Sequence, residues 1–243
     1  MKFINKYKSL NYDLRKKNCI IKHIVIHYTA MRSDLEAVKH LCNIRNKVSS
    51  HFLINKLGEI YSLVNIRYRA WHAGKSYWNK EEDINSTSIG IELENSGHFL
   101  DFENYSNLQI DSLCDLLIFL KKKYKIQSHN ILGHSDIAPY RKIDPGEKFP
   151  WKKLHLNKII KIPLVNIEKN LTKDNVSLNE PSMILRKTKA LNMLKIIGYD
   201  IMPAYINKKN FMFLVRAYQM HYRQDDVSGV LDRKTFEIIK NQY

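Results

Sequence analysis

The sequence lacks the features that mark several large classes of protein. Its 243 residues include only 3 cysteines, Cys19, Cys42 and Cys114, and none forms a CxxC pair. Their odd number and wide separation argue against a disulfide framework and against a thiolate zinc site. No apolar run approaches the roughly 20 residues of a membrane-spanning helix, and the basic N-terminus lacks the apolar segment of a secretory signal. We expect free thiols, with Cys114 packed in a helix core, and no integral membrane segment.

Acidic residues are also scarce. The 24 Asp and Glu residues are outnumbered by 40 Lys and Arg, which gives a formal net charge of +16. Such a field favours polyanionic partners. The lysine clusters at 121–123 and 208–209 have no interleaved aromatic residues, however, and no helix-turn-helix or zinc-finger pattern accompanies them. We therefore interpret the charge as spread over solvated surfaces and expect no nucleic-acid partner, with nucleic-acid binding as the weaker alternative.

The chain is rich enough in apolar residues, at 44%, to build a packed core. Two kinds of apolar pattern are interleaved along its first two thirds. Short β-branched or alternating runs predict strands at 18–30, 49–55, 59–64, 88–95 and 130–132. Helical spacing predicts helices over 35–45, 107–124 and 150–161. The mixture predicts an α/β fold with a mixed central β-sheet.

The last third of the chain has a different composition. Residues 162–181 are polar, with a proline near each end, and we interpret them as a linker. Helical patterns follow at 182–197, 210–222 and 232–240, and Gly198 suits the end of the first of them. The sequence thus predicts a first domain over residues 1–161 and a small all-α domain of three helices over residues 182–243.

Most of the chemistry-bearing residues gather in the stretch LGHSDIAPYRKIDPGEKFP, residues 132–150. It contains Gly and Pro and no apolar period, which predicts a shaped loop. Loops on rigid scaffolds often carry binding and catalytic groups. His134 and Asp144 in this loop, together with His27 at the end of the first strand, would provide two imidazoles and one carboxylate. Such a set with an open fourth position is typical of a catalytic zinc site, although spacing alone leaves capping and packing roles open.

Two glutamates lie on the otherwise apolar strand at 88–95. Glu92 and Glu94 are two residues apart, so both side chains point to the same side of the strand. Either could act as a general base beside a metal-bound water. The alternative is a solvated strand face. Alternation therefore does not choose between the two carboxylates.

An aromatic loop at 67–78 contains a further histidine. His72 could be a metal ligand or an orienting group, with Trp71 and Trp78 forming a wall of the site. Packing of the whole loop on the core is an equally weighted alternative. The histidines at 51, 98 and 155 are interpreted as structural or solvated.

These segments resemble the zinc-dependent N-acetylmuramoyl-L-alanine amidases of the type-2 amidase and peptidoglycan-recognition-protein superfamily. The similarity runs through most of residues 10–155. The matching motifs are VIHYTA (25–30), VSSHFLI (48–54), AWHAG (70–74), TSIGIELEN (87–95) and LGHSDIAPYRKIDPGEKFPW (132–151). The last two motifs, in this order, are highly specific.

The resemblance implies a mixed sheet flanked by helices and a set of site residues. It implies Zn²⁺ held by His27, His134 and Asp144, with Glu92 as the catalytic carboxylate and Lys142 as the oxyanion stabiliser. The expected substrate contacts are Tyr28, Trp71, His72, Asn95 and Arg141. The implied reaction is hydrolysis of the amide between N-acetylmuramic acid, or its anhydro form, and L-alanine in peptidoglycan or muropeptides. A non-catalytic muropeptide sensor is the alternative.

The C-terminal segment FLVRAYQMHYRQDDVSGVLDRKTFEIIK resembles a three-helix peptidoglycan-binding module. A helical cap on the amidase domain, without a ligand of its own, is an equally weighted interpretation. The tail suggests the bacterial cell envelope, or periplasm, whereas the missing signal suggests the cytoplasm. We expect a monomer.

Overall fold

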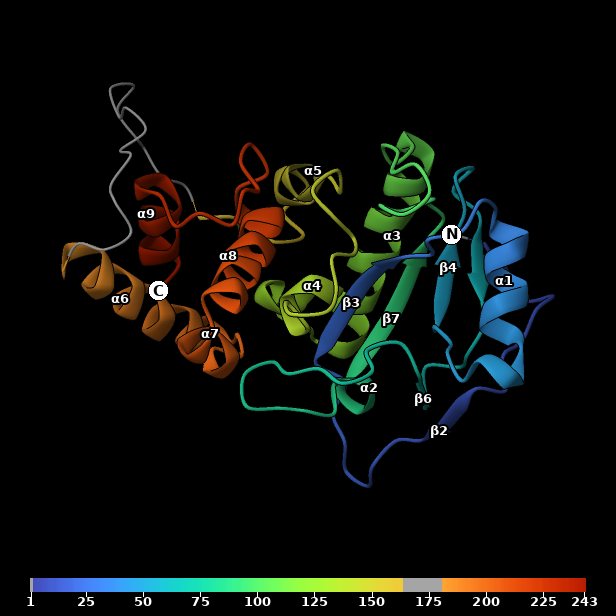
Figure 1. The fold of residues 1–243 in the computed structure, drawn as a ribbon. Helices are drawn as coiled ribbons and strands as arrows, with labels where there is room; N and C mark the ends of the chain where they lie inside the picture. Colours follow the sequence, from blue (N-terminus) through green and yellow to red (C-terminus); the bar gives the residue numbers. More distant parts are fainter. Residues whose placement is uncertain (1, 164–180) are drawn as a thin grey trace.

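The structure is a computed structural model that describes residues 2–163 and 181–243, without the side chains of 181–183. Its centre is a six-stranded sheet in the order β1-β5-β4-β7-β3-β8 (Figure 1). These strands are β1 (Phe3–Ile4), β5 (Ile60–Ser62), β4 (Phe52–Ile54), β7 (Ser88–Leu93), β3 (His23–Tyr28) and β8 (Ile131–Gly133). The β4–β5 pair is antiparallel and every other pair is parallel. The predicted α/β class with a mixed sheet is confirmed, whereas the predicted linker lies almost entirely outside the described residues.

Helix α3 (Asn107–Tyr124) covers one face of the sheet. Its first turn is capped by Ser106, whose hydroxyl accepts a hydrogen bond from the Gln109 N–H. Apolar residues at helical spacing pack on alternate residues of the central strands. The shared cluster contains Ile24, Ile26, Ile89, Ile91, Leu93, Ile110, Leu113, Cys114 and Leu117. The predicted bounds of this helix and the buried position of Cys114 are both confirmed.

The opposite face of the sheet is covered by different elements along its width. Helix α1 (Asp34–Cys42) packs through Val38 and Leu41 on Leu53 of β4. The C-terminal helices pack on Val25 of β3 and on Leu132 of β8. Between these two groups lies the loop that contains His72, since a Cβ atom added to Gly90 of β7 would lie 2.4 Å from the His72 ring. Because side chains alternate along a strand, His27 and Glu92 point to this same loop-covered face.

Helices α6 (Pro181–Ile197), α7 (Met202–Ile206), α8 (Lys208–Tyr222) and α9 (Arg233–Gln242) follow the undescribed segment. They share one hydrophobic cluster with the sheet, in which Val25, Leu132 and Ile137 meet Leu191, Tyr199 and Tyr218. Figure 1 shows α8 alongside α4 (His134–Ile137), the helix that carries the motif histidine. The packing favours the helical-cap interpretation, and the division into two domains stays a prediction.

Several short elements differ from the sequence-based expectation. The C-terminal part has four helices rather than three, because the five-residue helix α7 was not predicted. The stretch at 132–150 opens with the one-turn helix α4, and the expected helix over 150–161 is limited to α5 (Trp151–Leu156). The aromatic loop contains β6 (Tyr68–Ala70), which pairs with β2 (Tyr12–Leu14) in a second, antiparallel sheet.

Asp136 of α4 joins the C-terminal helices to the motif loop through polar contacts. Its carboxylate is fully buried. Oδ2 accepts a hydrogen bond from the Gly133 N–H at 2.7 Å and lies 2.7 Å from His221 Nδ1, while Oδ1 accepts from the Tyr199 hydroxyl at 2.6 Å. The His221 ring stacks on Trp151 with centroids 3.6 Å apart. Residues of the C-terminal helices and of the turn after α6 therefore satisfy a charge buried next to the motif histidine.

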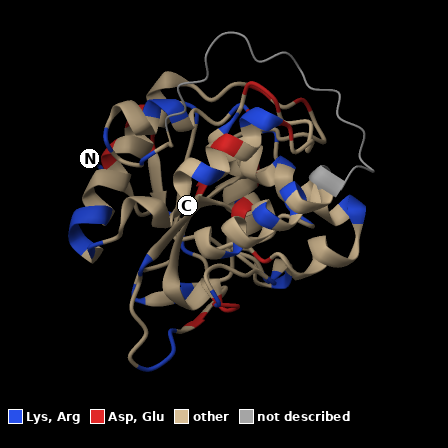
Figure 2. Cartoon of the chain, turned by 90° about the vertical axis from the view of Figure 1, so that its left-hand side faces the viewer, with Lys and Arg blue, Asp and Glu red and all other residues tan. Residues whose placement is uncertain are grey.

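Basic residues are distributed over many helices and loops rather than along a single element (Figure 2). This distribution agrees with the interpretation of a charge spread over solvated surfaces. Among the described residues, no helix combines the length and the apolar character that crossing a membrane requires.

Removing the Tyr199 hydroxyl should destabilise the fold. In Tyr199→Phe, Oδ1 of the buried Asp136 loses its donor, and a hydrogen bond to a charged group contributes about 1.5–3 kcal/mol. Urea unfolding should report a loss of that size. The control is Tyr205→Phe, since the half-exposed Tyr205 hydroxyl donates to Asn192 at the surface. Its expected effect is within about 0.5 kcal/mol, and equal losses in the two variants would contradict the role given to Asp136.

Candidate metal centre

Three separate segments bring His27, His134 and Asp144 together. His27 lies near the carboxyl end of β3, and His134 begins α4 directly after β8. Because β3 and β8 are adjacent and parallel, both histidines lie at the same edge of the sheet. Asp144 comes from the loop after α4 and is held there by its main chain, since the Ser135 N–H donates to the Asp144 carbonyl oxygen at 2.9 Å.

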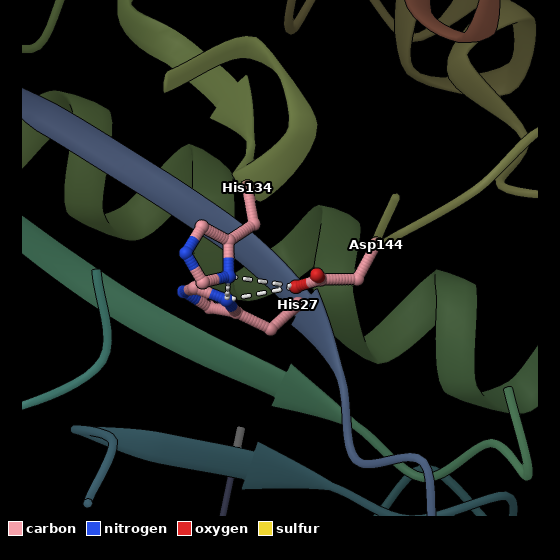
Figure 3. A group of neighbouring side chains, drawn as sticks. All are labelled: His27, His134 and Asp144. Atoms are coloured by element: carbon pink, nitrogen blue, oxygen red, sulfur yellow. Dashed lines mark hydrogen bonds and ion pairs between the residues drawn. The ribbon is translucent and has the colours of Figure 1, made fainter. Parts of the chain in front are cut away.

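The polar atoms of these three side chains face one another (Figure 3). The Nδ1 atoms of His27 and His134 are 2.9 Å apart, and each lies 3.0 Å from Oδ2 of Asp144. All three residues are buried. Two imidazole nitrogens and one carboxylate oxygen form a donor set that Zn²⁺ accepts. The three predicted ligands therefore form a cluster that is consistent with a metal site.

The protonation states of His27 and Asp144 also suit a cation. Burial, and after it the neighbouring His134 imidazole, lower the pKa of His27 to about 4, although Asp144 acts in the opposite direction. Burial alone would raise the pKa of Asp144, but the nearby His134 and the hydrogen bonds from both imidazoles outweigh it and hold the pKa well below its usual range. At neutral pH His27 is neutral and Asp144 is ionised, which is the state that metal binding needs.

The strand register distinguishes Glu92 from Glu94. Glu92 is paired directly with His27 across the β3–β7 ladder. Its Oε2 atom is buried and has no hydrogen-bond partner, which is rare for a buried polar atom. Glu94 lies beyond the end of β7, and its Oε2 accepts a hydrogen bond from the Lys56 N–H at 2.9 Å. Both carboxylates are buried, so the solvated-face alternative is wrong, and only Glu92 lies beside the metal centre.

The surroundings of Glu92 stabilise its protonated form relative to that of a solvent-exposed glutamate. Burial raises the pKa of Glu92 well above its usual value, and the nearby Asp144 carboxylate raises it further, while Lys142 opposes both. A carboxyl with a raised pKa is suited to accept and return a proton near neutral pH. The half-buried Lys142 brings a positive charge close enough to influence both Glu92 and His27.

Three of the expected substrate contacts, Tyr28, Trp71 and Arg141, have polar partners within the fold. The Tyr28 hydroxyl lies 3.0 Å from His98 Nδ1. Trp71 is partly exposed, and its indole N–H donates to Asp13 at 2.7 Å. The exposed Arg141 donates from Nε to the Lys75 carbonyl oxygen at 2.8 Å and also donates to the Ala73 carbonyl oxygen. Direct contact of these three with substrate stays a prediction.

Two other expected contacts are buried in ways that conflict with touching a substrate. Asn95 is 1% exposed, and its amide group bonds to the Glu103 carbonyl oxygen and the Gly97 N–H. Asn95 therefore shapes the loop after β7. The His72 ring lies behind His27, with its Nδ1 atom 3.0 Å from His27 Nε2. Of the two roles considered for His72, this position supports the orienting group.

The remaining aromatic and histidine predictions have mixed outcomes. Trp78 as a wall of the site is wrong, because it is 2% exposed and its ring packs 4.8 Å from the ring of Tyr199. The structural interpretation of His51, His98 and His155 is confirmed, since each forms a hydrogen bond within the fold.

Sequence reasoning missed two residues that support the site. Arg15 donates to the carbonyl oxygens of Asn85 and Ser88, and its guanidinium lies 3.0 Å from His51 Nε2. The Asn85 amide oxygen accepts the N–H groups of two residues in the aromatic loop. Both lie in polar, unpatterned stretches, so no local signal distinguishes them from surface residues.

Comparison with known proteins agrees with this geometry. A family model described as N-acetylmuramoyl-L-alanine amidase matches residues 16–147, more than half of the chain. The chain belongs to this family. The N-acetylmuramoyl-L-alanine amidase AmiD of Escherichia coli K12 is 34% identical over 231 residues, which span 88% of this amidase and 79% of AmiD. The 1,6-anhydro-N-acetylmuramyl-L-alanine amidase AmpD of Haemophilus influenzae is 44% identical over 164 residues, or 60% and 87% of the two chains.

Solved structures extend the similarity to the C-terminal helices. The complex of E. coli AmiD with anhydro-N-acetylmuramic acid-L-Ala-D-γ-Glu-L-Lys has a TM-score of 0.80 at 30% identity, and the match covers 93% of this amidase and 91% of AmiD. AMPDH3 from Pseudomonas aeruginosa has a TM-score of 0.76 at 30% identity, covering 99% and 97%. The similarity to these two structures therefore extends beyond the family match at residues 16–147 and includes the C-terminal helices.

The buried His51 should make stability depend on pH. Burial and then Arg15 lower the pKa of His51 to about 3, against 6.5 in an unfolded chain. Its contribution is complete above pH 6.5 and is lost as the pH falls toward 3, because there only the unfolded state binds the proton. The slope is at most about 1.4 kcal/mol per pH unit for one histidine. Urea unfolding between pH 7 and 5 should show a shallower slope for His51→Phe than for the wild type.

The control for this measurement is His129→Gln, since His129 is exposed. It should keep the wild-type slope. An unchanged slope in His51→Phe would show that the buried imidazole does not carry this part of the pH dependence.

Proposed function

We propose that this amidase is zinc-dependent and hydrolyses the amide that joins N-acetylmuramic acid, or its anhydro form, to L-alanine. One observation carries the proposal. The buried Glu92 carboxylate, whose Oε2 atom has no hydrogen-bond partner, lies on the strand residue directly opposite His27, and His27 belongs to the cluster with His134 and Asp144. The muropeptide class of substrate is supported by the anhydro-muropeptide in the AmiD complex. Such substrates suit action in the bacterial cell envelope or the cytoplasm.

The described residues fit a zinc ion. His27 Nδ1, His134 Nδ1 and Asp144 Oδ2 would hold it, and this set is that of catalytic rather than structural zinc sites. When bound, zinc acts as a Lewis acid toward a carbonyl oxygen and lowers the pKa of water to about 7.

Glu92 transfers the proton, and Lys142 stabilises the developing negative charge. Glu92 takes a proton from the water that attacks the lactyl carbonyl carbon, and a new C–O bond forms. The same carboxyl returns the proton to the alanine nitrogen as the C–N bond breaks, which leaves a carboxylic acid and a free peptide amine. The Lys142 ammonium stabilises the negative charge that develops on the carbonyl oxygen. The raised pKa of Glu92 favours this exchange of a proton near neutral pH.

The alternative of a muropeptide sensor that binds without cleavage is not favoured. Binding alone gives no reason to bury a carboxylate oxygen without a partner, and such an atom costs stability. A general base needs that atom free for the attacking water, so its presence supports an enzyme.

Metal removal should stop cleavage reversibly. Purified muropeptides and anhydro-muropeptides are incubated with the protein as prepared, after chelation and after Zn²⁺ is added back, and the products are identified by mass spectrometry. Free peptide should appear, disappear on chelation and return with Zn²⁺. Cleavage that continues in the chelated protein would refute zinc dependence, and tight binding without cleavage would favour the sensor.

Single substitutions should separate metal binding from catalysis. Asp144→Ala should lose stoichiometric zinc, whereas Lys142→Ala should retain zinc and lose about 10²- to 10³-fold in kcat. Glu92→Gln should also retain zinc and lose turnover. The matched control is Glu94→Gln, whose amide oxygen can still accept from the Lys56 N–H. Full activity in Glu92→Gln, or a comparable loss in Glu94→Gln, would contradict the assignment of the general base.

A further inference from the structure

The two candidate ligand histidines are both contacted at the ring nitrogen that points away from the metal centre. Nδ1 of each ring faces Asp144. Nε2 of His27 lies 3.0 Å from Nδ1 of His72, and Nε2 of His134 lies 3.0 Å from the Ala73 carbonyl oxygen. Two consecutive residues of the aromatic loop therefore contact the backs of both imidazoles.

The hydrogen bonds behind His27 form a chain with a defined direction. An imidazole that binds a cation through Nδ1 carries its proton on Nε2, so His27 donates to Nδ1 of His72. His72 then carries its own proton on Nε2, which lies 3.1 Å from Ser88 Oγ, and the Ser88 hydroxyl donates to the Ile84 carbonyl oxygen. Every donor in the chain has an acceptor when Nδ1 of His27 faces the metal centre.

The side chain of Asn85 holds the aromatic loop at two consecutive backbone N–H groups. Asn85 is a buried residue of α2 (Ile84–Thr87). Its Oδ1 atom accepts hydrogen bonds from the N–H groups of His72, at 3.0 Å, and Ala73, at 2.8 Å. Gly90 of β7 completes the arrangement, because any Cβ there would overlap the His72 ring. Asn85 therefore helps to fix the position of the backbone behind both imidazoles.

We infer that His72 and Asn85 are positioning residues that hold both imidazoles with Nδ1 directed at the metal. The inference rests on the proposed function for the presence of the metal. Partners of this kind orient a ligand and fix its tautomer, and their loss typically costs about 10- to 100-fold in metal affinity. His72 has this role instead of the substrate contact expected from the sequence.

The test is the affinity of the full chain for Zn²⁺, measured by competition with a chromogenic chelator, together with the absorption spectrum of the Co²⁺-loaded protein. His72→Leu removes the acceptor and should weaken Zn²⁺ binding by about 10- to 100-fold and change the Co²⁺ spectrum. His72→Asn keeps an oxygen near the position of Nδ1 and should recover most of the affinity. Asn85→Ala should weaken binding, while Asn85→Asp, which keeps the acceptor oxygen, should preserve it.

The matched control is His51→Phe. His51 is also buried and its ring centroid lies 5.8 Å from that of His72, yet its hydrogen-bond partners are Arg15, Tyr68 and Gly90 rather than a candidate ligand. This variant should lose stability and keep the wild-type affinity for Zn²⁺.

Wild-type affinity and an unchanged Co²⁺ spectrum in His72→Leu would overturn the inference. An equal loss of affinity in His51→Phe would also overturn it, because the effect would then be general weakening of the fold. If His72→Leu does not fold, the Zn²⁺ affinities of Asn85→Ala and Asn85→Asp provide the test. Equal, wild-type affinities in both variants would overturn the inference. Because the readout is metal affinity, a wild-type protein that binds Zn²⁺ without cleaving muropeptides would refute the proposed function and not this inference.

Discussion

The candidate metal centre depends on the position of β3 between two parallel neighbours. Pairing with β7 sets His27 opposite Glu92, and pairing with β8 brings the start of α4 to the same edge of the sheet. Because the side-chain period of a strand is two, a slip of one residue would turn His27 toward the core beneath α3. The apolar residues Ile24 and Ile26 on that face fix the register. Hydrophobic packing on one face of the sheet therefore fixes the positions of His27 and Glu92 on the other face.

Long, patterned elements of this chain could be predicted from the sequence, and short ones could not. Helix α3 has enough residues at helical spacing for its period to be clear. Helix α7 has five residues and β6 has three, so each spans less than two repeats of its pattern. Their formation depends on partners far away in the sequence, such as β2 for β6.

The site residues that belong to a sequence motif could be predicted. Those whose role depends on tertiary contacts could not. His27, His134 and Asp144 were found from residue type and from the resemblance, and the structure brings them together. Alternation along the strand did not choose between Glu92 and Glu94; the resemblance implied Glu92, and the strand register sets Glu92 opposite His27. Trp78 was misassigned because the helices that cover it follow more than a hundred residues later, and Asn85 acts through main-chain N–H groups that no side-chain pattern reveals.

The buried Asp136 carboxylate has a consequence for how this fold can be cut or recombined. Its oxygen atoms are shared between the motif loop and two side chains that follow residue 181, Tyr199 and His221. If the amidase core were fused to a different C-terminal segment, Asp136, two positions from His134, would remain buried without the hydrogen-bond partners Tyr199 and His221. A replacement C-terminal segment must therefore provide a hydroxyl and an imidazole at the positions of Tyr199 and His221. Otherwise Asp136 must be substituted together with the segment.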